Sequence, residues 1–490
     1  MLYQSTRSRH TVNSLQAILE GIAPDGGLYL PVDLDSLNVD VARVADKSFE
    51  ETAAVILRTL FDEFTEEEMA DMVRRAYRGK FETEDCTPTV KVGGDYVLEL
   101  FRGPTSAFKD VALSMLPVLI TEAKKKLGIT EKILILTATS GDTGKAALEG
   151  FHDVEGTGII VFYPNGGVSA VQKAQMVTQE GNNVTVCAIE GNFDDAQTGV
   201  KNTFAACAKK DLTQYGVRLS SANSINIGRL APQIVYYYKS YCDLVAAGEI
   251  KMGDKINFVV PTGNFGDILA GYFAKCLGLP VNKLVCASNQ NDVLTEFLNT
   301  GRYDRRREFY RTNSPSMDIL VSSNLERMLY LAAKGDCDKI AGYMKALNEE
   351  GEYTVDADLL ASLQDTFFAG CCSEEKTLQT IRDTYVTYGY LCDTHTAVAV
   401  AVAKDFKATE AEGKTVILST ASPYKFPVSV LSAIGKEPDA DEFRVMEQLN
   451  EATQVPVPEG LAGLKEKKVL HTDVIPKDAI LDYVLKKVEA

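Results

Sequence analysis

One lysine, Lys109, stands where a nucleophile can be held at the start of a helix. It follows a Gly103-Pro104 turn and precedes an apolar run, 111–119, that is typical of a helix. Further along, glycine turns at 139–145 and 263–267 each connect a short apolar run to a helix-like stretch. Backbone amides at such helix starts bind anions. A lysine nucleophile with an anion-binding turn suits pyridoxal phosphate, whose aldehyde takes an amine and whose phosphate takes N–H groups.

The turn at 263–267 is the predicted site for the cofactor phosphate, because it follows a buried strand and opens a helix. A side chain at either of its glycines would crowd the phosphate and demand a disfavoured backbone conformation. The alternative is an ordinary strand-to-helix turn, in which glycine is common. Its residues are Gly263, Asn264, Phe265, Gly266 and Asp267.

The turn at 139–145 is not a Walker A loop, because Thr139 replaces the first glycine and Ala146 replaces the final Ser or Thr. Its hydroxyl and N–H groups at a helix start suit a carboxylate instead. A helix capped by Asp142 or Thr143 is the competing interpretation. The candidate residues are Ser140, Gly141, Asp142 and Thr143.

A third polar cluster places two amides, a hydroxyl and a guanidinium close together, in Asn223, Ser224, Asn226 and Arg229. These groups can surround a phosphate ester, which Arg229 would bind with its two-pronged guanidinium. The alternative is a polar loop with an exposed arginine.

Three further features have simpler interpretations. The hydroxyl of Thr420, after a strand at 416–418, can reach a heteroaromatic nitrogen or can cap a turn. His395 is expected to be a satisfied core residue or a helix-start residue. The run Arg305-Arg306-Arg307 is expected to form a surface salt-bridge group.

Composition limits the partners and the location. The chain has 490 residues and a formal net charge of −17, which disfavours nucleic acid and anionic membranes. No apolar run suggests a membrane span, and no signal-peptide pattern opens the sequence. The four histidines lack metal-ligand spacing, so no metal is expected, and the ten scattered cysteines predict reduced, mostly buried thiols. We therefore expect a cytoplasmic protein that acts on a small molecule.

The pattern of apolar and polar residues along the chain predicts three regions. They are a mainly helical N-terminal domain over 1–95, a catalytic region of two α/β subdomains over 96–435, and a C-terminal packing extension over 436–490. In the catalytic region, runs that are apolar on both faces alternate with helices. They predict parallel strands at 133–136, 159–163, 184–189, 256–260, 284–287 and 416–418. Parallel sheets bind ligands at the carboxyl ends of their strands, where the glycine turns fall.

Five motifs in the same order resemble those of the threonine synthase family, within the fold-type II pyridoxal-phosphate enzymes. They are 3–7, 99–110, 138–144, 223–229 and 263–267, and they extend over nearly the whole chain. The resemblance implies conversion of O-phospho-L-homoserine and water to L-threonine and phosphate by a carbon–oxygen lyase with pyridoxal 5'-phosphate. A monomer or homodimer is expected.

The resemblance also assigns roles. Lys109 holds the cofactor aldehyde and later moves protons, the 263–267 turn holds the cofactor phosphate, and Thr420 faces the pyridine nitrogen. The 140–143 turn takes the substrate carboxylate, with Asp142 near the cofactor's 3-hydroxyl. The cluster Asn223, Ser224, Asn226 and Arg229 holds the substrate phosphate. The chain departs from many relatives at Arg102, where they carry histidine.

Two other functions stay open from the sequence. A serine or threonine dehydratase would need the cofactor site but no second phosphate site, so the 223–229 cluster speaks against it. A pyridoxal-phosphate-binding relative without turnover would keep the cofactor groups alone. Release of phosphate from phosphohomoserine distinguishes these from the implied reaction.

Overall fold

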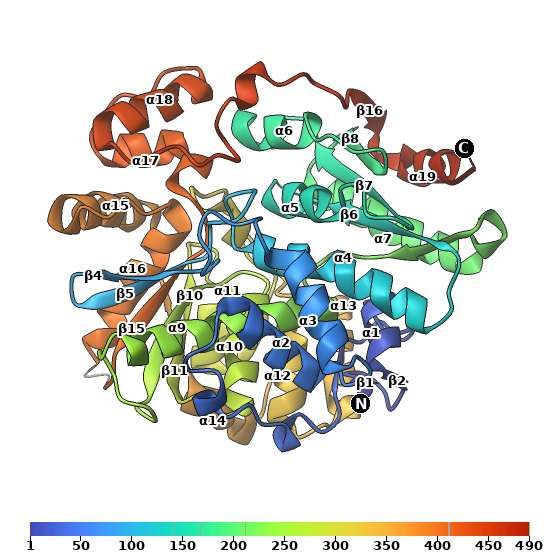
Figure 1. The fold of residues 1–490 in the computed structure, drawn as a ribbon, viewed down its shortest axis with the longest axis horizontal. Coiled ribbons are helices and arrows are strands. Elements are labelled where there is room, and N and C mark those ends of the chain that lie inside the picture. Colours follow the sequence, from blue (N-terminus) through green and yellow to red (C-terminus); the bar gives the residue numbers. More distant parts are fainter. Residues whose placement is uncertain (140, 167, 211, 410–411, 490) are drawn as a thin grey trace.

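Two sheets of mostly parallel strands organise the chain, and helices pack around them (Figure 1). The computed structural model describes residues 1–139, 141–166, 168–210, 212–409 and 412–489. Both sheets draw most of their strands from the region in which apolar runs alternate with helices. The predicted α/β class, with parallel sheets flanked by helices, is therefore confirmed.

The larger sheet is buried on both faces. Along its strand β10 (Ile256–Pro261), Phe258 and Val260 belong to the main hydrophobic core, whereas Val259 belongs to a second core beneath helix α16 (Thr394–Lys407). Successive residues of a strand point to opposite faces, so a continuous apolar run marks such a strand. All its pairings are parallel except that of β4 with β5. In spatial order the strands are β14 (Phe367–Cys371), β11 (Val281–Ser288), β10 (Ile256–Pro261), β15 (Thr415–Ser419), β5 (Asp95–Glu99) and β4 (Thr89–Val92).

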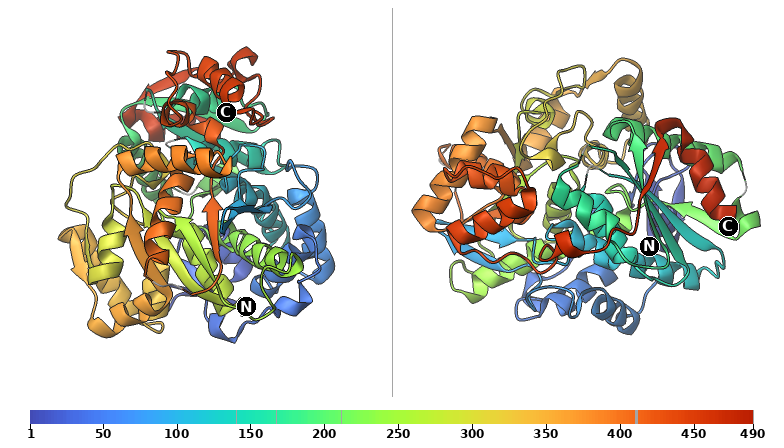
Figure 2. Two further views of the ribbon diagram at one scale, coloured as in Figure 1. Left: turned by 90° about the vertical axis from the view of Figure 1, so that its left-hand side faces the viewer. Right: turned by 90° about the horizontal axis from the view of Figure 1, so that it is seen from above.

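The smaller sheet is parallel throughout, and the C-terminal region completes it (Figure 2). The strands, in spatial order, are β16 (Asp473–Pro476), β8 (Val184–Glu190), β7 (Thr157–Pro164), β6 (Lys132–Ala138) and β9 (Val217–Ser220). Helix α19 (Ile480–Glu489) then packs on α7 (Phe193–Lys209) and buries Ile480 and Val484. The sequence does not predict the edge strand β16, whose four residues are too few to show a period.

The N-terminal region combines helices with a small antiparallel sheet that the sequence does not predict. Helices α2 (Phe49–Leu60) and α3 (Glu66–Tyr77) begin at capping boxes of Ser48 with Glu51 and of Thr65 with Glu68. The sheet joins β1 (Leu2–Ser5) to β2 (Thr11–Asn13) and β3 (Tyr29–Pro31). Strands of three or four residues carry too little periodicity to be recognised.

The six predicted strands are all present, in β6, β7, β8, β10, β11 and β15. The apolar runs do not predict β4, β5, β9, β12, β13 or β14. The remaining described helices and strands are α1 (Ser14–Glu20), α4 (Lys109–Lys126), α5 (Asp142–Phe151), α6 (Ala170–Val177), α8 (Ile227–Leu230), α9 (Ile234–Ala246), α10 (Gly266–Cys276), α11 (Val293–Thr300), β12 (Arg302–Asp304), α12 (Leu325–Ala332), α13 (Cys337–Glu349), β13 (Glu352–Thr354), α14 (Ala357–Thr366), α15 (Glu374–Tyr388), α16 (Thr394–Lys407), α17 (Pro427–Ala433) and α18 (Glu442–Thr453). Within the described ranges, no helix has the length and apolar character needed to cross a bilayer.

Candidate active site

The segment before Lys109 lies against the end of strand β15. The amide of Phe108 donates to the carbonyl of Thr420 at 2.8 Å, and Ala107 pairs with Ala421 as an isolated bridge. Lys109 is the first residue of α4 and is buried. Thr420 is also buried, and no hydrogen bond of its side-chain hydroxyl is seen among the described residues. Thr420 and Lys109 therefore lie in adjoining segments, although they are far apart in the sequence.

Hydrogen bonds and close packing between Asp110 and the preceding turn fix the conformation of the segment before Lys109. Asp110 accepts hydrogen bonds from both the amide and the hydroxyl of Thr105. A Cβ on Gly103 would lie 2.5 Å from the Cβ of Asp110, so only glycine allows this close approach. Burial raises the pKa of Asp110 to about 6, although the Thr105 hydrogen bonds lower it. The Gly-Pro turn is thus fixed against α4, and Lys109 with it.

Asp142 carries the negative charge nearest to Lys109. Its Oδ2 lies 4.0 Å from Lys109 Nζ, and its Oδ1 lies 3.0 Å from Lys425 Nζ and accepts from Gln172 at 2.9 Å. Burial alone would raise the pKa of Asp142, but the two lysines and these hydrogen bonds hold it well below its usual range. Burial lowers the pKa of Lys109 to about 8; Asp142 opposes this shift, while Arg229 and Lys425 reinforce it.

The turn before Asp142 is built around the hydroxyl of Thr139, which accepts from the amides of Gly141 and Gly144, both at 2.9 Å. Gly141 has φ 141°, and a Cβ there would lie 2.5 Å from the side chain of Gln172. Glycine is therefore required at position 141 on two grounds. Thr143 is half-buried in the first turn of α5, and Ser140 lies outside the described residues.

The 263–267 turn leads into α10, which begins at Gly266. Among the described residues, its amides donate to no turn or loop acceptor, and Gly266 and Asp267 open the helix, where no intrahelical acceptor is available. Asn264 is exposed, whereas Phe265 is buried, with its ring centroid 5.5 Å from that of Phe367. This turn can hold an anion through its N–H groups.

The strained residue of this turn is Phe265, with φ 61°; neither glycine has a positive φ. The expectation that Gly263 and Gly266 occupy a disfavoured conformation is therefore wrong. Gly263 is required by close approach, since a Cβ there would lie 2.8 Å from the carbonyl oxygen of Ser316. Gly266 has more room, with Asn324 Nδ2 at 3.4 Å from such a Cβ.

Asp267 is buried with one oxygen uncommitted. The hydroxyls of Tyr236 and Tyr237 donate to Oδ1 at 2.6 and 2.8 Å, whereas Oδ2 has no hydrogen-bond partner. Burial raises the pKa of Asp267 to about 6, against the lowering effect of the two tyrosines and of Lys109. The carboxyl group therefore binds a proton below about pH 6, and a proton on Oδ2 can then be donated to an anion.

Arg229 is buried with few protein partners. Among the described residues its guanidinium donates to the carbonyl of Ala222 at 2.6 Å and has no carboxylate within ion-pair distance. Burial lowers its pKa to about 10. Most of its N–H groups are thus available for an anionic ligand, since a guanidinium has five.

The other members of the 223–229 cluster differ in what their side chains do. Asn226 is fully engaged: its Nδ2 donates to the carbonyls of Ile18 and Ser221 and its Oδ1 accepts from Gly228 N. Asn223 and Ser224 are half-buried, and no hydrogen bond to their side chains is seen among the described residues. A Cβ on Gly266 would lie 3.7 Å from the Cβ of Ser224, so the two candidate anion sites adjoin.

Three side chains that organise the site have no motif that reveals them. Gln172 on α6 and Lys425 hold Asp142, and Arg327 on α12 is fully buried and donates to the carbonyl of Ile225 at 2.6 Å. The only local signal is a charged residue within an apolar stretch, as for Lys425 between Tyr424 and Phe426. Such a signal does not identify the partner, which lies 30 residues away for Gln172, 102 for Arg327 and farther still for Lys425.

Three features flagged in the sequence lie outside this group of contacts. His395 is buried with both ring nitrogens satisfied, by Asp393 Oδ2 at 2.7 Å and by Ser316 N at 3.1 Å, as its simpler interpretation predicts. Arg102 pairs with Glu99 and Glu82.

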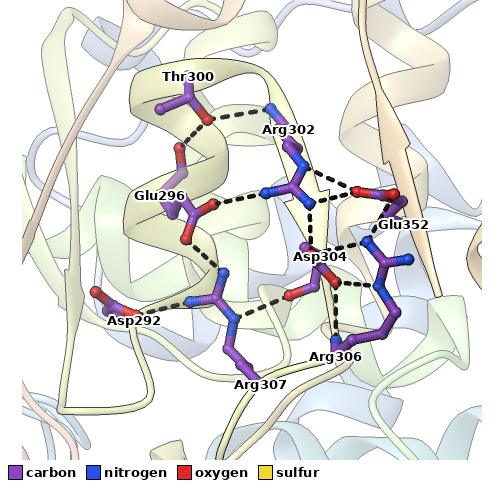
Figure 3. Close-up of polar contacts among 8 residues, drawn as sticks. All are labelled: Asp292, Glu296, Thr300, Arg302, Asp304, Arg306, Arg307 and Glu352. Atoms are coloured by element: carbon purple, nitrogen blue, oxygen red, sulfur yellow. Dashed lines mark hydrogen bonds and ion pairs between the residues drawn. The ribbon is translucent and has the colours of Figure 1, made fainter.

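The predicted arginine group is a partly exposed ion-pair network beside β12 (Figure 3). Arg306 pairs with Asp304 and Glu352, and Arg307 pairs with Asp292 and Glu296. Arg305 instead donates to the carbonyl of Asn348 at 3.0 Å. The expected surface salt-bridge group is thus present, with Arg302 as a further member.

Three family models match the chain. The one described as the threonine synthase N terminus matches residues 2–77, the one for pyridoxal-phosphate dependent enzymes matches 95–422, and the threonine synthase C-terminal one matches 396–481. The second covers more than half of the chain and includes the segments of Lys109, Asp142, Arg229 and Asp267.

Curated relatives are similar to this chain along most of its sequence. Threonine synthase of Saccharomyces cerevisiae is 37% identical over an alignment of 468 residues, which covers 88% of this chain and 89% of that protein. Human threonine synthase-like 1 is 38% identical over an alignment of 435 residues, which covers 86% of this chain but only 58% of that longer relative.

Solved structures agree along the whole chain. The pyridoxal-phosphate-bound threonine synthase of Brucella melitensis has a TM-score of 0.87 at 37% identity, covering 100% of this chain and 99% of that one. The yeast enzyme has a TM-score of 0.88 at 33% identity, covering 99% and 98%. The chain therefore belongs to the threonine synthase family of pyridoxal-phosphate-dependent enzymes.

Proposed function

We propose that this chain converts O-phospho-L-homoserine and water to L-threonine and phosphate, as a carbon–oxygen lyase with pyridoxal 5'-phosphate. Membership of the family supports this proposal. Two adjoining anion sites support it further, because the cofactor and the substrate each carry a phosphate. Serine and threonine carry none, so a dehydratase would leave the second site without a ligand.

The residues present fit the cofactor. Lys109 is a buried amine whose pKa of about 8 leaves part of it neutral near physiological pH, as attack on an aldehyde requires. The amides of 263–267 would hold the cofactor phosphate, and the uncommitted Oδ2 of Asp267 could add a donor. The neutral hydroxyl of Thr420 would face the pyridine nitrogen, and Asp142 the 3-hydroxyl.

Lys109 is the proposed proton carrier. Pyridoxal phosphate, when bound, supplies an electron-accepting ring that stabilises negative charge at the carbon beside the substrate amine. The neutral Nζ of Lys109 would take a proton at that carbon, and its lowered pKa makes both uptake and release of the proton accessible. Burial of Lys109 and Asp142 keeps bulk water from the proton while it is held.

Arg229 would determine substrate specificity, because its guanidinium is buried and nearly unpartnered. A buried cation without a counter-ion is costly, and a dianionic phosphate would remove that cost. Asn223 and Ser224 would add uncharged donors to the same group. Asn226 would act by positioning the loop, since its own amide is engaged with the protein.

The turn of Gly141 and Thr143 would bind the substrate carboxylate at the start of α5. Ser140 is proposed as part of this turn on the family resemblance alone. The acidity of the chain supports a small-molecule ligand in preference to nucleic acid. We propose that the chain is cytoplasmic and that it is a monomer or a homodimer. Sedimentation of the purified chain tests the oligomeric state.

The decisive experiment incubates the purified, cofactor-loaded chain with O-phospho-L-homoserine and follows phosphate release and threonine by chromatography. Equal amounts of phosphate and threonine are expected. Parallel reactions with L-serine and L-threonine test the rival: formation of a keto acid, without turnover of phosphohomoserine, would identify a dehydratase. Visible cofactor absorbance without any turnover would identify a binding protein.

A further inference from the structure

Lys425 is a buried lysine beside the candidate site to which no role in the proposed reaction has yet been given. Its side chain is 0% exposed. Nζ lies 3.0 Å from Asp142 Oδ1, donates to the carbonyl of Thr105 at 3.2 Å, and also donates to Gln175 Oε1. A lysine ammonium has three N–H donors, so protein groups account for all of them. Lys425 therefore has no donor left for a ligand, and its function must act through the groups it holds.

Asp142 divides its two oxygens between two lysines. Oδ1 faces Lys425 at 3.0 Å and accepts from Gln172, whereas Oδ2 lies 4.0 Å from Lys109. The nearer contact is with Lys425, at hydrogen-bond distance; the contact with Lys109 is longer than a hydrogen bond. The charge of Asp142 is thus balanced mainly by Lys425, and Oδ2 stays directed toward Lys109.

This arrangement matters because Lys109 must lose its proton before it can act as a nucleophile or base. An aspartate paired with Lys109 alone would favour the ammonium form. Charged groups from several elements act on Lys109: anionic Asp142, Asp110 and Asp267, and cationic Arg229 and Lys425. Lys425 both balances the nearest anion and repels a proton on Lys109.

We propose that Lys425 is a positioning residue that balances the charge of Asp142, so that Lys109 stays available as a free amine. The proposal rests on the assignment of Lys109 as the reacting lysine. It adds a second lysine, whose ammonium contacts among the described residues are with Asp142, Thr105 and Gln175. It also gives the fully buried ammonium of Lys425 a purpose. Without Lys425, the buried carboxylate of Asp142 would lose its nearest counter-charge, which is costly.

The test measures the proton affinity of Lys109 without cofactor or substrate. The cofactor-free full chain is treated with a trace of acetic anhydride over a pH series, and mass spectrometry gives the labelling rate of the Lys109 peptide. Lys425→Met removes the charge and keeps the length. We expect labelling near neutral pH to fall roughly tenfold or more, because the pKa of Lys109 rises when one nearby cation is lost.

Lys145→Met is the matched control. Lys145 is also a buried lysine of this region, but it bonds to Glu149 and Gln179 instead of Asp142. Its replacement should leave the Lys109 profile close to wild type. An unchanged profile in Lys425→Met, or the same change in both variants, would overturn the proposal.

A second pair of variants covers the case in which Lys425→Met does not fold. Asp142→Asn is nearly isosteric and should speed Lys109 labelling, because the anion is lost while Lys425 remains. Asp142→Asn combined with Lys425→Met removes both charges and should return the rate toward wild type. Identical rates in the single and the double variant would show that Lys425 does not act on Lys109. Because no substrate is present, failure of the proposed reaction would not alter this readout.

Discussion

Asn324 donates both its backbone amide and its side-chain amide to the carbonyl oxygen of Asn264, at 3.0 and 3.1 Å. Asn324 Oδ1 in turn accepts from Arg327 at 2.7 Å, and Arg327 also donates to the carbonyl of Ile225 at 2.6 Å. One short stretch before and within α12 therefore ties the 263–267 turn to the 223–229 cluster. The spacing of the two candidate anion sites is set by this link.

Arg327→Met should destabilise the chain and weaken both sites together. Its guanidinium also donates to the carbonyl of Tyr29 at 2.9 Å, so the change leaves several buried acceptors unsatisfied. A loss of about 3 kcal/mol or more in the free energy of unfolding is expected, measured by urea denaturation. Arg302→Met, in the partly exposed network of Figure 3, is the control and should cost much less. A change in stability no larger than that of the control would contradict the link.

Lys109→Ala should abolish the visible Schiff-base absorbance, because no other amine is placed to replace it. In the wild type, borohydride should fix the cofactor to one peptide, identified by mass spectrometry as that of Lys109. Lys145→Ala should keep the absorbance. Labelling of a peptide containing Lys145 or Lys425 would show that the assignment of the reacting lysine is wrong.

Arg229→Ala should lower kcat/KM for O-phospho-L-homoserine by roughly ten- to a hundredfold or more, the loss expected for a charge-assisted contact. Arg229→Lys keeps a charge but loses the two-pronged geometry, so it should also be impaired. Both variants should retain the cofactor spectrum. Arg102→Ala is the control, since Arg102 is already paired with Glu99 and Glu82.

The outcomes for Arg229 separate the two anion sites. Near-wild-type turnover in both Arg229 variants, with a large loss in Arg102→Ala, would move the substrate phosphate toward Arg102. Loss of cofactor absorbance in both Arg229 variants would mean that the two phosphate sites are assigned the wrong way round.

Gly266→Ala should weaken the cofactor without weakening the fold. A Cβ at this position meets Asn324 Nδ2 at 3.4 Å and Ser224 Cβ at 3.7 Å, distances that the protein tolerates. A methyl group between the two loops would instead crowd a bound phosphate, and cofactor affinity should fall roughly tenfold or more. Gly342→Ala, at a helix position with open space, is the control. Full affinity in Gly266→Ala would place the phosphate elsewhere.

Asp267→Asn should change how the stability of the cofactor-free chain depends on pH. Burial raises the pKa of Asp267 from 3.8 to about 6, so between these values the native state binds a proton that the unfolded state has lost. The free energy of unfolding therefore falls as pH rises through this window, by about 3 kcal/mol from this group. Asn cannot ionise, so the variant should lack this part of the decline.

The measurement is denaturation by urea at a series of pH values, with the surface variant Asp478→Asn as control. The difference between Asp267→Asn and the wild type should grow as pH rises through the window and then become constant. A difference that does not depend on pH would show that Asp267 does not carry the proton.

The sequence by itself determined the parts of this protein that depend on neighbouring residues. A strand buried on both faces needs a continuous apolar run, and the runs at 133–136 and 256–260 predict β6 and β10 correctly. Glycine turns after those strands predict two helix starts, and both are present. The amides of the 263–267 turn donate to no turn or loop acceptor among the described residues, whereas in the 139–145 turn the Thr139 hydroxyl accepts from Gly141 and Gly144. Its own turn and helix single out Lys109 in the sequence, and the structure places it as the buried first residue of α4. In each case the physical cause, burial or backbone freedom, acts over a few residues.

Only the tertiary structure decided which groups share a charge or a hydrogen bond. The motif predicts that Asn226 binds the substrate phosphate, yet its side-chain amide donates to the carbonyls of Ile18 and Ser221. Phe265, not its glycine neighbours, takes the left-handed conformation. Lys425 and Arg327 carry no motif, because their partners Asp142 and Ile225 are distant in the chain and meet them only after the sheets assemble. The charge of a buried group depends on what surrounds it in space, and local sequence patterns do not record that surrounding.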